Sequence, residues 1–357
     1  MCLKPMIPNI SFSPLNLPLR PVNFFQNIVY LVLFVFYILS GQLGFVLILE
    51  ASVDENENEH HQKESTVMPC LARGELSGVF LARSFSSKLT RTIIREHVNQ
   101  LSSTLEKVHG SMLPLLVSSD DEGGHRLNYP AVYSQWPSLM SIGATNNPLI
   151  GRQYGLGYGH DLKQVGMNVV FSPVSDVNIE PDNPIIGPRS FGSSLPRVSA
   201  MINATVGGFL DAGIAPTLKH WPGHGATKED SHLHLPSVDA TLTDAIHLAP
   251  FTDNMLTQKN VNGAPIIMSG HLLAKGLDQN RPVSISKIAL TNKLKKELGF
   301  LGVIVSDALN MRGITSFLKI EHESRITEKS VVYLAALEAG NDLLLDSSFG
   351  AQCGQGA

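Results

Sequence analysis

The sequence predicts a (β/α)8 barrel, an α/β fold in which eight parallel strands alternate with helices around a single ring. Two observations support this prediction. Short apolar runs rich in β-branched residues alternate with longer segments of helical periodicity from about residue 70 onward. Polar residues also recur where the apolar runs end, as they do in barrels whose active sites lie on the C-terminal face of the strands. A chain of 357 residues is long enough for one such domain.

Eight apolar runs supply the expected strands. They cover residues 43–49, 78–82, 114–119, 169–174, 216–219, 265–269, 303–306 and 341–345. Between them lie helix candidates at 90–109, 148–165, 196–212 and 286–298, the last of which begins with a serine that can cap its N-terminus. Residues 350–357 are glycine-rich and polar, so we expect the last barrel helix to be truncated.

Composition narrows the function classes. Hydrophobic residues make up 43% and charged residues 16% of the chain, which favours a packed core over disorder. The formal net charge of −4 provides no basic surface for phosphate backbones, so we expect a neutral substrate and no nucleic acid. The three cysteines form no C-x-x-C pair, which argues against a zinc knuckle. We expect the protein to be a monomer.

The first part of the chain resembles a targeting segment. Residues 1–27 contain two basic residues and no acid, residues 28–49 are almost wholly apolar, and acidic residues follow. This order is typical of an exported chain under the positive-inside rule. Residues 28–49 could attach the chain to a membrane as a signal anchor, or residues 28–39 could be the apolar part of a signal peptide.

A third interpretation is a short leader followed by a barrel strand. A strand inside a barrel cannot also cross a bilayer, so the two uses of residues 43–49 exclude each other. We expect a leader or anchor over residues 1–40, one catalytic barrel over 41–357, and a polar loop at 54–65 within it. Export or membrane anchoring is the expected location, and a cytoplasmic location is the alternative.

Five polar residues follow predicted strands and identify the expected functional face. They are Asp120, Asp176, His220, His271 and Asp307. A single aspartate after a strand is more often a loop cap than a functional group. In a parallel barrel, however, the C-terminal ends of all strands meet on one face, where active sites form. Five such residues therefore favour an active site there.

The loop over residues 181–192 contains three prolines and two glycines, so it is expected to have a defined irregular shape. Its Arg189 has two interpretations that the sequence leaves open. The planar guanidinium could bind a sugar hydroxyl or a carboxylate, or it could pair with Asp182 and hold the loop together.

The segment from residue 219 to residue 232 is the densest in chemical groups. Pro222, Gly223 and Gly225 prevent a regular helix, so a strand end leading into an irregular loop is expected. Asp230 and His232 lie two residues apart and face the same way if the backbone is extended. A carboxylate beside an imidazole fixes its tautomer and stabilises the imidazolium, which predicts a general acid/base pair.

Two other interpretations of this segment remain. Its histidines could merely hydrogen-bond the backbone of their own loop. Alternatively, His220, His224, His232 and His234 could join Asp230 as ligands for zinc. Their spacing is not a helical His-x-x-x-His, and a proline separates the first two, so metal binding is the less favoured interpretation.

Asp307 ends an apolar strand over residues 303–306. A negative charge there costs several kcal/mol unless it is paired or acts on a cation-like centre. The oxocarbenium-like transition state of glycoside hydrolysis is such a centre, and a carboxylate below the sugar ring can bond to the anomeric carbon as a nucleophile. Asp307 is therefore a candidate nucleophile.

Taken together, these motifs resemble glycoside hydrolase family 3, and within it the bacterial β-N-acetylglucosaminidases. The resemblance extends from about Leu71 to Leu345. Its anchors are Asp120-Asp121-Glu122-Gly123-Gly124, Ser172-Pro173-Val174-Ser175-Asp176-Val177, the loop from Asp182 to Gly192, Lys219-His220-Trp221-Pro222-Gly223-His224-Gly225, Asp230-Ser231-His232 and Ser306-Asp307. Several separate motifs in the family's order argue against a chance match.

The resemblance implies a role for each motif. Asp307 would be the nucleophile, and His232, oriented by Asp230, would be the acid/base that replaces the second carboxylate of most glycosidases. Sugar-binding roles would fall to Asp120, Arg189, Lys219 and His220. The Asp-Ser-His element implies N-acetylglucosamine as the sugar. The implied reaction is a retaining double displacement that requires no metal and no organic cofactor.

One residue departs from the pattern, and two rival functions stay open. Asp121 stands where the family more often has an amide, so we expect extra charge near the sugar site. A family 3 β-glucosidase or glycoside phosphorylase, and a catalytically inactive sugar-binding barrel, are the alternatives. The natural glycan could be peptidoglycan fragments or chitin oligomers. All of these expectations require Asp307 and His232 to reach the same sugar.

Overall fold

The computed structural model describes residues 47–51, 67–109, 114–239, 246–319 and 326–347. The predicted leader, the polar loop at 54–65 and the chain end after residue 347 lie outside the described residues. Among the described residues, no helix is long and apolar enough to cross a membrane. The exported location therefore stays a prediction from the sequence.

Eight parallel strands form the barrel in two four-stranded sheets. The first sheet has the order β10 (Leu344–Asp346), β1 (Leu47–Ala51), β2 (Leu76–Leu81), β3 (Leu116–Ser118). The second has the order β4 (Val169–Val170), β5 (Ala215–Trp221), β7 (Ile266–Ser269), β9 (Val303–Ser306). A further short pair, β6 (Ser237–Val238) and β8 (Leu273–Ala274), lies outside these sheets. All eight predicted runs thus contain a strand of the barrel.

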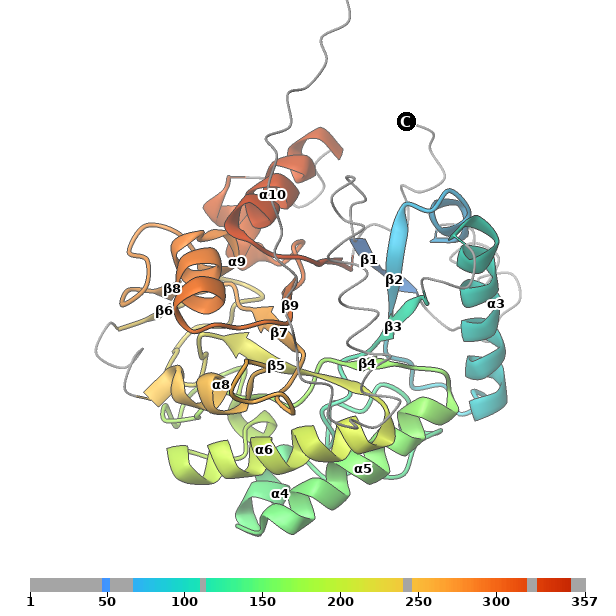
Figure 1. Ribbon diagram of the computed structural model, residues 1–357, viewed down its shortest axis with the longest axis horizontal. Coiled ribbons are helices and arrows are strands. Elements are labelled where there is room, and N and C mark those ends of the chain that lie inside the picture. Colours follow the sequence, from blue (N-terminus) through green and yellow to red (C-terminus); the bar gives the residue numbers. More distant parts are fainter. Residues whose placement is uncertain (1–46, 52–66, 110–113, 240–245, 320–325, 348–357) are drawn as a thin grey trace, which may run out of the picture.

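Backbone hydrogen bonds join the two sheets at both seams. Between β3 and β4, the amides of Asn168 and Phe171 donate to the carbonyls of Val117 and Ser119, at 3.1 and 2.8 Å. Between β9 and β10, the amide of Ser306 donates to the carbonyl of Leu343 at 2.9 Å. The strands therefore follow one another around one ring, as Figure 1 shows.

The first strand resolves part of the question about the apolar leader. Residues Leu47 to Leu49 pair in parallel with β10 on one side and β2 on the other. They belong to the barrel, so a membrane span over the whole of 28–49 is wrong for its last three residues. Residues 43–46, the first part of the predicted strand, lie outside the described residues.

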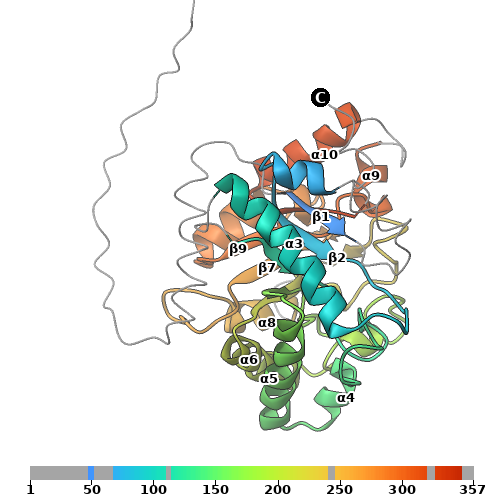
Figure 2. The same ribbon diagram turned by 90° about the vertical axis from the view of Figure 1, so that its right-hand side faces the viewer.

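Long helices cover the ring close to where the sequence predicts them. They are α3 (Arg91–His109), α5 (Pro148–Gln164), α6 (Leu195–Ala212) and a π-helix over Ile288–Glu297. The Ser286 hydroxyl accepts the Ala289 amide at 3.1 Å, as expected of the predicted cap. Shorter helices are α4 (Leu139–Ala144), α8 (Ala249–Asn254) and α9 (Arg312–Phe317), and α10 (Ile326–Ala339) precedes β10. Figures 1 and 2 show α5 and α6 side by side on one flank and α3 on another.

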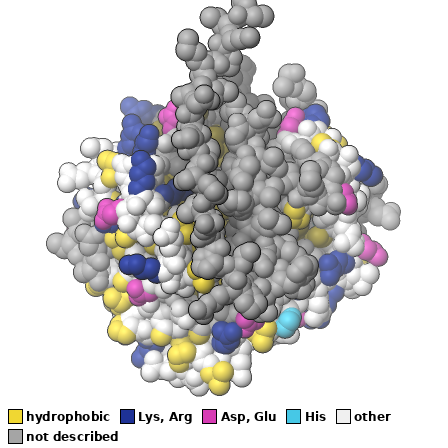
Figure 3. Space-filling view, in the orientation of Figure 1, with side chains coloured by type: hydrophobic (Ala, Val, Ile, Leu, Met, Phe, Trp, Pro, Cys, Tyr) yellow, Lys and Arg dark blue, Asp and Glu magenta, His cyan; other side chains and the backbone are white. Residues whose placement is uncertain are grey.

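The core has an inner and an outer part. Side chains from all eight strands meet inside the ring, including Ile48, Leu116, Phe171, Ile266 and Val305. A larger cluster fills the space between the strands and the surrounding helices. On the face drawn in Figure 3, the described Lys and Arg side chains and the described Asp and Glu side chains lie scattered among neutral ones.

Candidate active site

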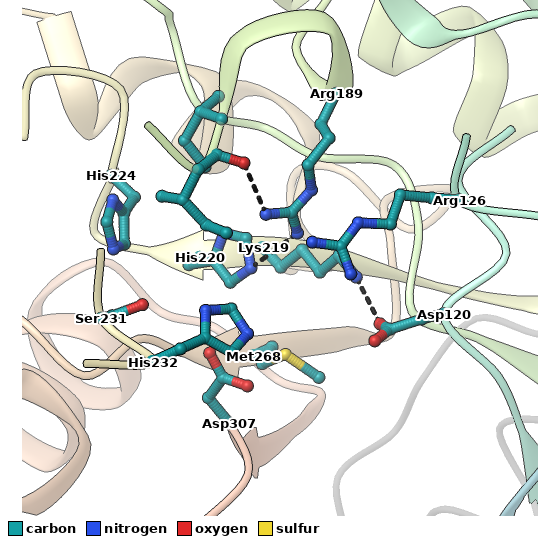
Figure 4. A pocket seen from close by; sticks show the side chains of 12 residues that line it. Asp120, Arg126, Arg189, Lys219, His220, His224, Ser231, His232, Met268 and Asp307 are labelled. Carbon is teal, nitrogen blue, oxygen red and sulfur yellow. Dashed lines mark hydrogen bonds and ion pairs between the residues drawn. The ribbon is translucent and has the colours of Figure 1, made fainter. Parts of the chain in front are cut away.

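A pocket lies at the C-terminal ends of the strands and encloses about 380 Å³ of space, part of it open to solvent. Six of the seven residues that the sequence predicts for the site line it, and they are Asp120, Arg189, Lys219, His220, His232 and Asp307. They come from the ends of β3, β5 and β9 and from two loops (Figure 4). The seventh, Asp230, is hydrogen-bonded to His232. The fold therefore gathers the whole predicted set.

A buried network of charges forms one wall of the pocket. The Lys219 ammonium lies 2.6 Å from a carboxylate oxygen of Asp120 and 2.6 Å from one of Glu122. The Arg189 guanidinium donates to both oxygens of Glu122, from Nε at 2.7 Å and from Nη2 at 2.9 Å. The predicted alternative partner of Arg189, Asp182, is therefore wrong: the loop arginine pairs with Glu122, and it still lines the pocket.

Glu122 is a residue of the charged wall to which the sequence alone assigned no role. Its side chain is 1% exposed, so burial alone would raise its pKa, but the positive charges of Arg189 and Lys219 and their hydrogen bonds hold the pKa well below its usual range. One buried carboxylate thus fixes two cations in position. The available signal was the position of Glu122, two residues after Asp120 beyond a strand.

His220 is oriented by Asp176 from behind the pocket. The Asp176 Oδ2 atom lies 2.9 Å from His220 Nδ1, and its Oδ1 accepts the amides of His220 and His224 at 3.2 and 2.7 Å. Burial opposes ionisation of Asp176, but the charges and hydrogen bonds of these two histidines lower its pKa. Asp176 was predicted on the functional face, and it acts there by holding the ring of His220 rather than by lining the pocket.

Asp307 lies directly after β9 with its carboxylate in the pocket. Burial would raise its pKa, but nearby His220 and His271 and the Ala308 amide, 2.8 Å from Oδ1, lower the pKa to about 2. The His271 ring contacts the Ala308 carbonyl at 3.0 Å and the Ser284 hydroxyl at 2.7 Å. Asp307 is thus an ionised carboxylate at the pocket floor, as a nucleophile requires.

The Asp230 and His232 pair has the geometry of an acid/base dyad. Asp230 Oδ1 accepts the His232 amide at 2.8 Å and lies 2.7 Å from His232 Nδ1. Partial burial opposes ionisation, but these hydrogen bonds keep the Asp230 pKa below its usual value. An ionised carboxylate on Nδ1 favours the tautomer that leaves Nε2 to exchange a proton with a ligand. Figure 4 shows the His232 ring beside the Asp307 carboxylate.

Asp121 does not add charge to the pocket, contrary to the expectation from the sequence. Its carboxylate points into the core, where it accepts the Ser119 hydroxyl, the Asn128 amide and the Tyr158 hydroxyl at 2.6, 2.8 and 2.7 Å. Burial raises its pKa to about 6 in spite of these three donors. Its neighbours Asp120 and Glu122 are the two that reach the site.

Several other pocket residues were not predicted. They are Arg126, Ile185, Ile186, His224, Ser231 and Met268. Arg126 reaches the pocket from a tight turn whose Gly123 and Gly124 have φ angles of +83° and +57°, a conformation that favours glycine. His224 bonds Thr227 at 2.6 Å, and burial and the charge of His220 lower its pKa to about 4, so it is neutral at pH 7.

The zinc interpretation gains no support from the arrangement of these histidines. Within the described part of the chain, no group of three or more His, Cys, Asp or Glu side chains could hold a metal ion. The Nδ1 atoms of His220, His224 and His232 each face a protein oxygen, from Asp176, Thr227 and Asp230 respectively.

Comparisons with known proteins identify relatives of the chain. The model of the glycosyl hydrolase family 3 N terminal domain matches residues 40–350. Beta-hexosaminidase A of Pseudoalteromonas piscicida is 34% identical over 267 residues, which are 69% of this chain and 43% of that protein. Beta-hexosaminidase LpqI of Mycobacterium tuberculosis is 35% identical over 247 residues, which are 66% of this chain and 59% of that protein. The chain thus spans less than two thirds of either relative.

Solved structures show the same fold. A glycoside hydrolase family 3 β-N-acetylglucosaminidase from Paenibacillus superposes with a TM-score of 0.72 at 26% identity, covering 93% of this chain and 57% of that one. The structure of M. tuberculosis LpqI superposes with a TM-score of 0.69 at 27% identity, covering 85% of this chain and 81% of that one.

Proposed function

The chain belongs to glycoside hydrolase family 3, and we propose that it is a retaining exo-β-N-acetylglucosaminidase that removes terminal N-acetylglucosamine from β-linked glycans. The relatives named as beta-hexosaminidases and the Paenibacillus β-N-acetylglucosaminidase support this sugar specificity.

The observation that carries the proposal is the meeting of an ionised Asp307 and the Asp230–His232 pair in one pocket. In the first step, Asp307 attacks the anomeric carbon while the His232 imidazolium gives its proton to the departing glycosidic oxygen. The bond to the aglycone breaks, and a glycosyl ester on Asp307 forms. Asp230 stabilises the imidazolium before this proton leaves.

In the second step, the neutral His232 takes a proton from water, whose oxygen attacks the anomeric carbon. The ester bond to Asp307 breaks, and both side chains return to their starting protonation states. Two inversions at the same carbon give overall retention. The acid/base is thus an imidazole steered by a carboxylate rather than a second carboxylate.

The charged wall of the pocket supplies the sugar-binding groups in this proposal. Asp120, Arg189, Lys219 and His220 would hold the hydroxyls of the sugar, because hydrogen bonds to ionised groups are stronger than neutral ones. Glu122 keeps Arg189 and Lys219 in place before the sugar arrives. These groups bind the sugar and do not select the natural aglycone, which could come from peptidoglycan fragments or chitin oligomers.

The test compares wild type with Asp307→Asn on nitrophenyl N-acetylglucosaminide and nitrophenyl glucoside. We expect wild type to prefer the N-acetylated sugar and the variant to lose at least about 10³-fold in kcat, while Asp253→Asn, at an exposed position on α8, keeps full activity. NMR of the first product should show the β-anomer. Near-wild-type turnover by Asp307→Asn would refute the assignment, and faster cleavage of the glucoside would refute the sugar specificity.

A further inference from the structure

The loop that carries His232 rests on the segment that follows the proposed nucleophile. Residues 230–234 form one compact turn, in which the amides of Leu233 and His234 donate to the Asp230 carbonyl at 3.0 and 2.9 Å. The Asp230 side chain also accepts the His232 amide. Because Asp230 holds the turn through both its side chain and its backbone, the turn moves as a unit and the His232 ring moves with it.

The turn contacts α9 at Gly313. The Gly313 amide donates to the Ser231 carbonyl at 3.2 Å. A Cβ atom built on Gly313 would lie 2.6 Å from that oxygen and 2.8 Å from the carbonyl oxygen of His234. The two carbonyls flank His232 in sequence. Both are backbone atoms, so an added methyl group cannot be accommodated by a side-chain rotation, and either the turn or α9 must shift.

The other side of this contact is rigid. Helix α9 begins five residues after Asp307, and its Ile314 is 0% exposed in a cluster with Leu309 and Leu344 of β10. The Leu309 amide also donates to the Leu345 carbonyl at 2.9 Å. Gly313 is therefore fixed relative to the barrel and to Asp307. Its φ angle is not in the left-handed region, so close approach rather than backbone conformation accounts for the glycine.

We propose that Gly313 is a positioning residue, which seats the acid/base turn and thereby sets the distance between His232 and Asp307. This inference rests on the proposed glycosidase function for its kinetic consequence. A displaced His232 would still leave Asp307 ionised in its pocket. The variant should therefore lose protonation of the leaving group while it keeps nucleophilic attack.

The experiment is Gly313→Ala, assayed on two N-acetylglucosaminides with different leaving groups. A sugar alcohol, the leaving group of a disaccharide substrate, needs the proton from His232, whereas dinitrophenolate departs without it. We expect kcat/KM for the poor leaving group to fall on the order of 10²-fold, as a misplacement of about 1 Å can cause, and kcat/KM for the dinitrophenyl substrate to change only a few-fold. Equal losses on both substrates, or no loss, would overturn the inference.

Two control variants separate this role from general instability. Gly302→Ala places a Cβ atom 2.1 Å from the Pro265 carbonyl oxygen, at the opposite end of β9 from the pocket. Ser316→Ala changes an exposed side chain of α9. Gly302→Ala should lower the melting temperature without splitting the two substrates, and Ser316→Ala should change neither. Should Gly313→Ala not fold, Ile314→Val, which loosens α9 without adding an atom, should give a smaller split of the same sign.

Hydrogen exchange gives a readout that needs no activity. Peptides covering residues 226–236 should exchange faster in Gly313→Ala than in wild type, and at the wild-type rate in Gly302→Ala. If this segment exchanges at the wild-type rate in Gly313→Ala, Gly313 does not position the turn. This conclusion would hold even for an enzyme of another specificity. If the wild-type protein cleaves neither N-acetylglucosaminide, the proposed function is refuted. The hydrogen-exchange result then decides alone whether Gly313 positions the turn.

Discussion

The buried Asp121 makes the stability of the protein depend on pH in a direction that can be measured. Its carboxylate is enclosed by three donors in the core, yet burial raises its pKa from 3.8 to about 6. A carboxyl group whose pKa is higher in the folded than in the unfolded state destabilises the fold when it is ionised. The penalty is fully present above about pH 6 and disappears as the pH falls to about 4.

The informative change is Asp121→Asn. An asparagine oxygen can accept the Asn128 amide and the Tyr158 hydroxyl, while its NH2 group donates to the Ser119 oxygen. The Ser119 hydroxyl can then turn to the Met167 sulfur, 3.1 Å away. A shift of about two pKa units corresponds to about 3 kcal/mol. The variant should therefore be more stable than wild type by roughly that amount at about pH 7.5, and equally stable near pH 4.

Urea unfolding monitored by fluorescence, at these two pH values, measures the effect. The slope of the unfolding free energy against urea should be the same in both proteins, because the buried surface does not change. Asp253→Asn, at an exposed carboxylate, should leave stability unchanged at both pH values. The reasoning fails if Asp121→Asn gains the same stability at both pH values, or is less stable than wild type at the higher one.

Two further outcomes follow from the carboxylates of Glu122 and Asp307. Glu122→Gln leaves Arg189 and Lys219 without their shared anion. It should therefore lower the unfolding free energy, measured with urea, by about 3–5 kcal/mol and raise KM in steady-state kinetics. Unchanged values of both quantities would show that the network has no such role. The pKa of Asp307 is lowered from 3.8 to about 2, so the proposed nucleophile stays ionised down to low pH, and the stability that it contributes is lost as the pH falls from about 4 through about 2. For the dinitrophenyl substrate, kcat/KM should accordingly stay flat between about pH 4 and pH 7, and a decline centred near pH 5 would contradict an ionised Asp307.

The strands of the barrel could be predicted because their signal is local. A run of apolar β-branched residues can be recognised without knowing what packs against it. Each of the eight predicted runs contains residues of an observed strand. The six-residue helices α4, α8 and α9 were not predicted, because segments this short have little helical periodicity and depend on packing.

The site could be predicted in part, because its residues follow strand ends. The part that could not be predicted is the network of Glu122. Its partners Arg189 and Lys219 are far away in the sequence, and Arg189 follows Glu122 by 67 residues. The orientation of Asp121 could have been found, since successive side chains of an extended segment face opposite sides. If Asp120 and Glu122 face the pocket, the residue between them faces the core. The role of Gly313 has no sequence signal, because it comes from the approach of a distant turn.

The closure of the strand ring has a consequence for how the protein matures. The pocket draws on Asp120 after the third strand of the ring and on Asp307 after the seventh, and the eighth strand, β10, holds the seventh against the first. Half-assembled intermediates therefore have no complete binding cleft, and enzymatic turnover can appear only when the last seam has formed. Recovery of activity during refolding would time that final event, separately from the earlier appearance of helical circular dichroism.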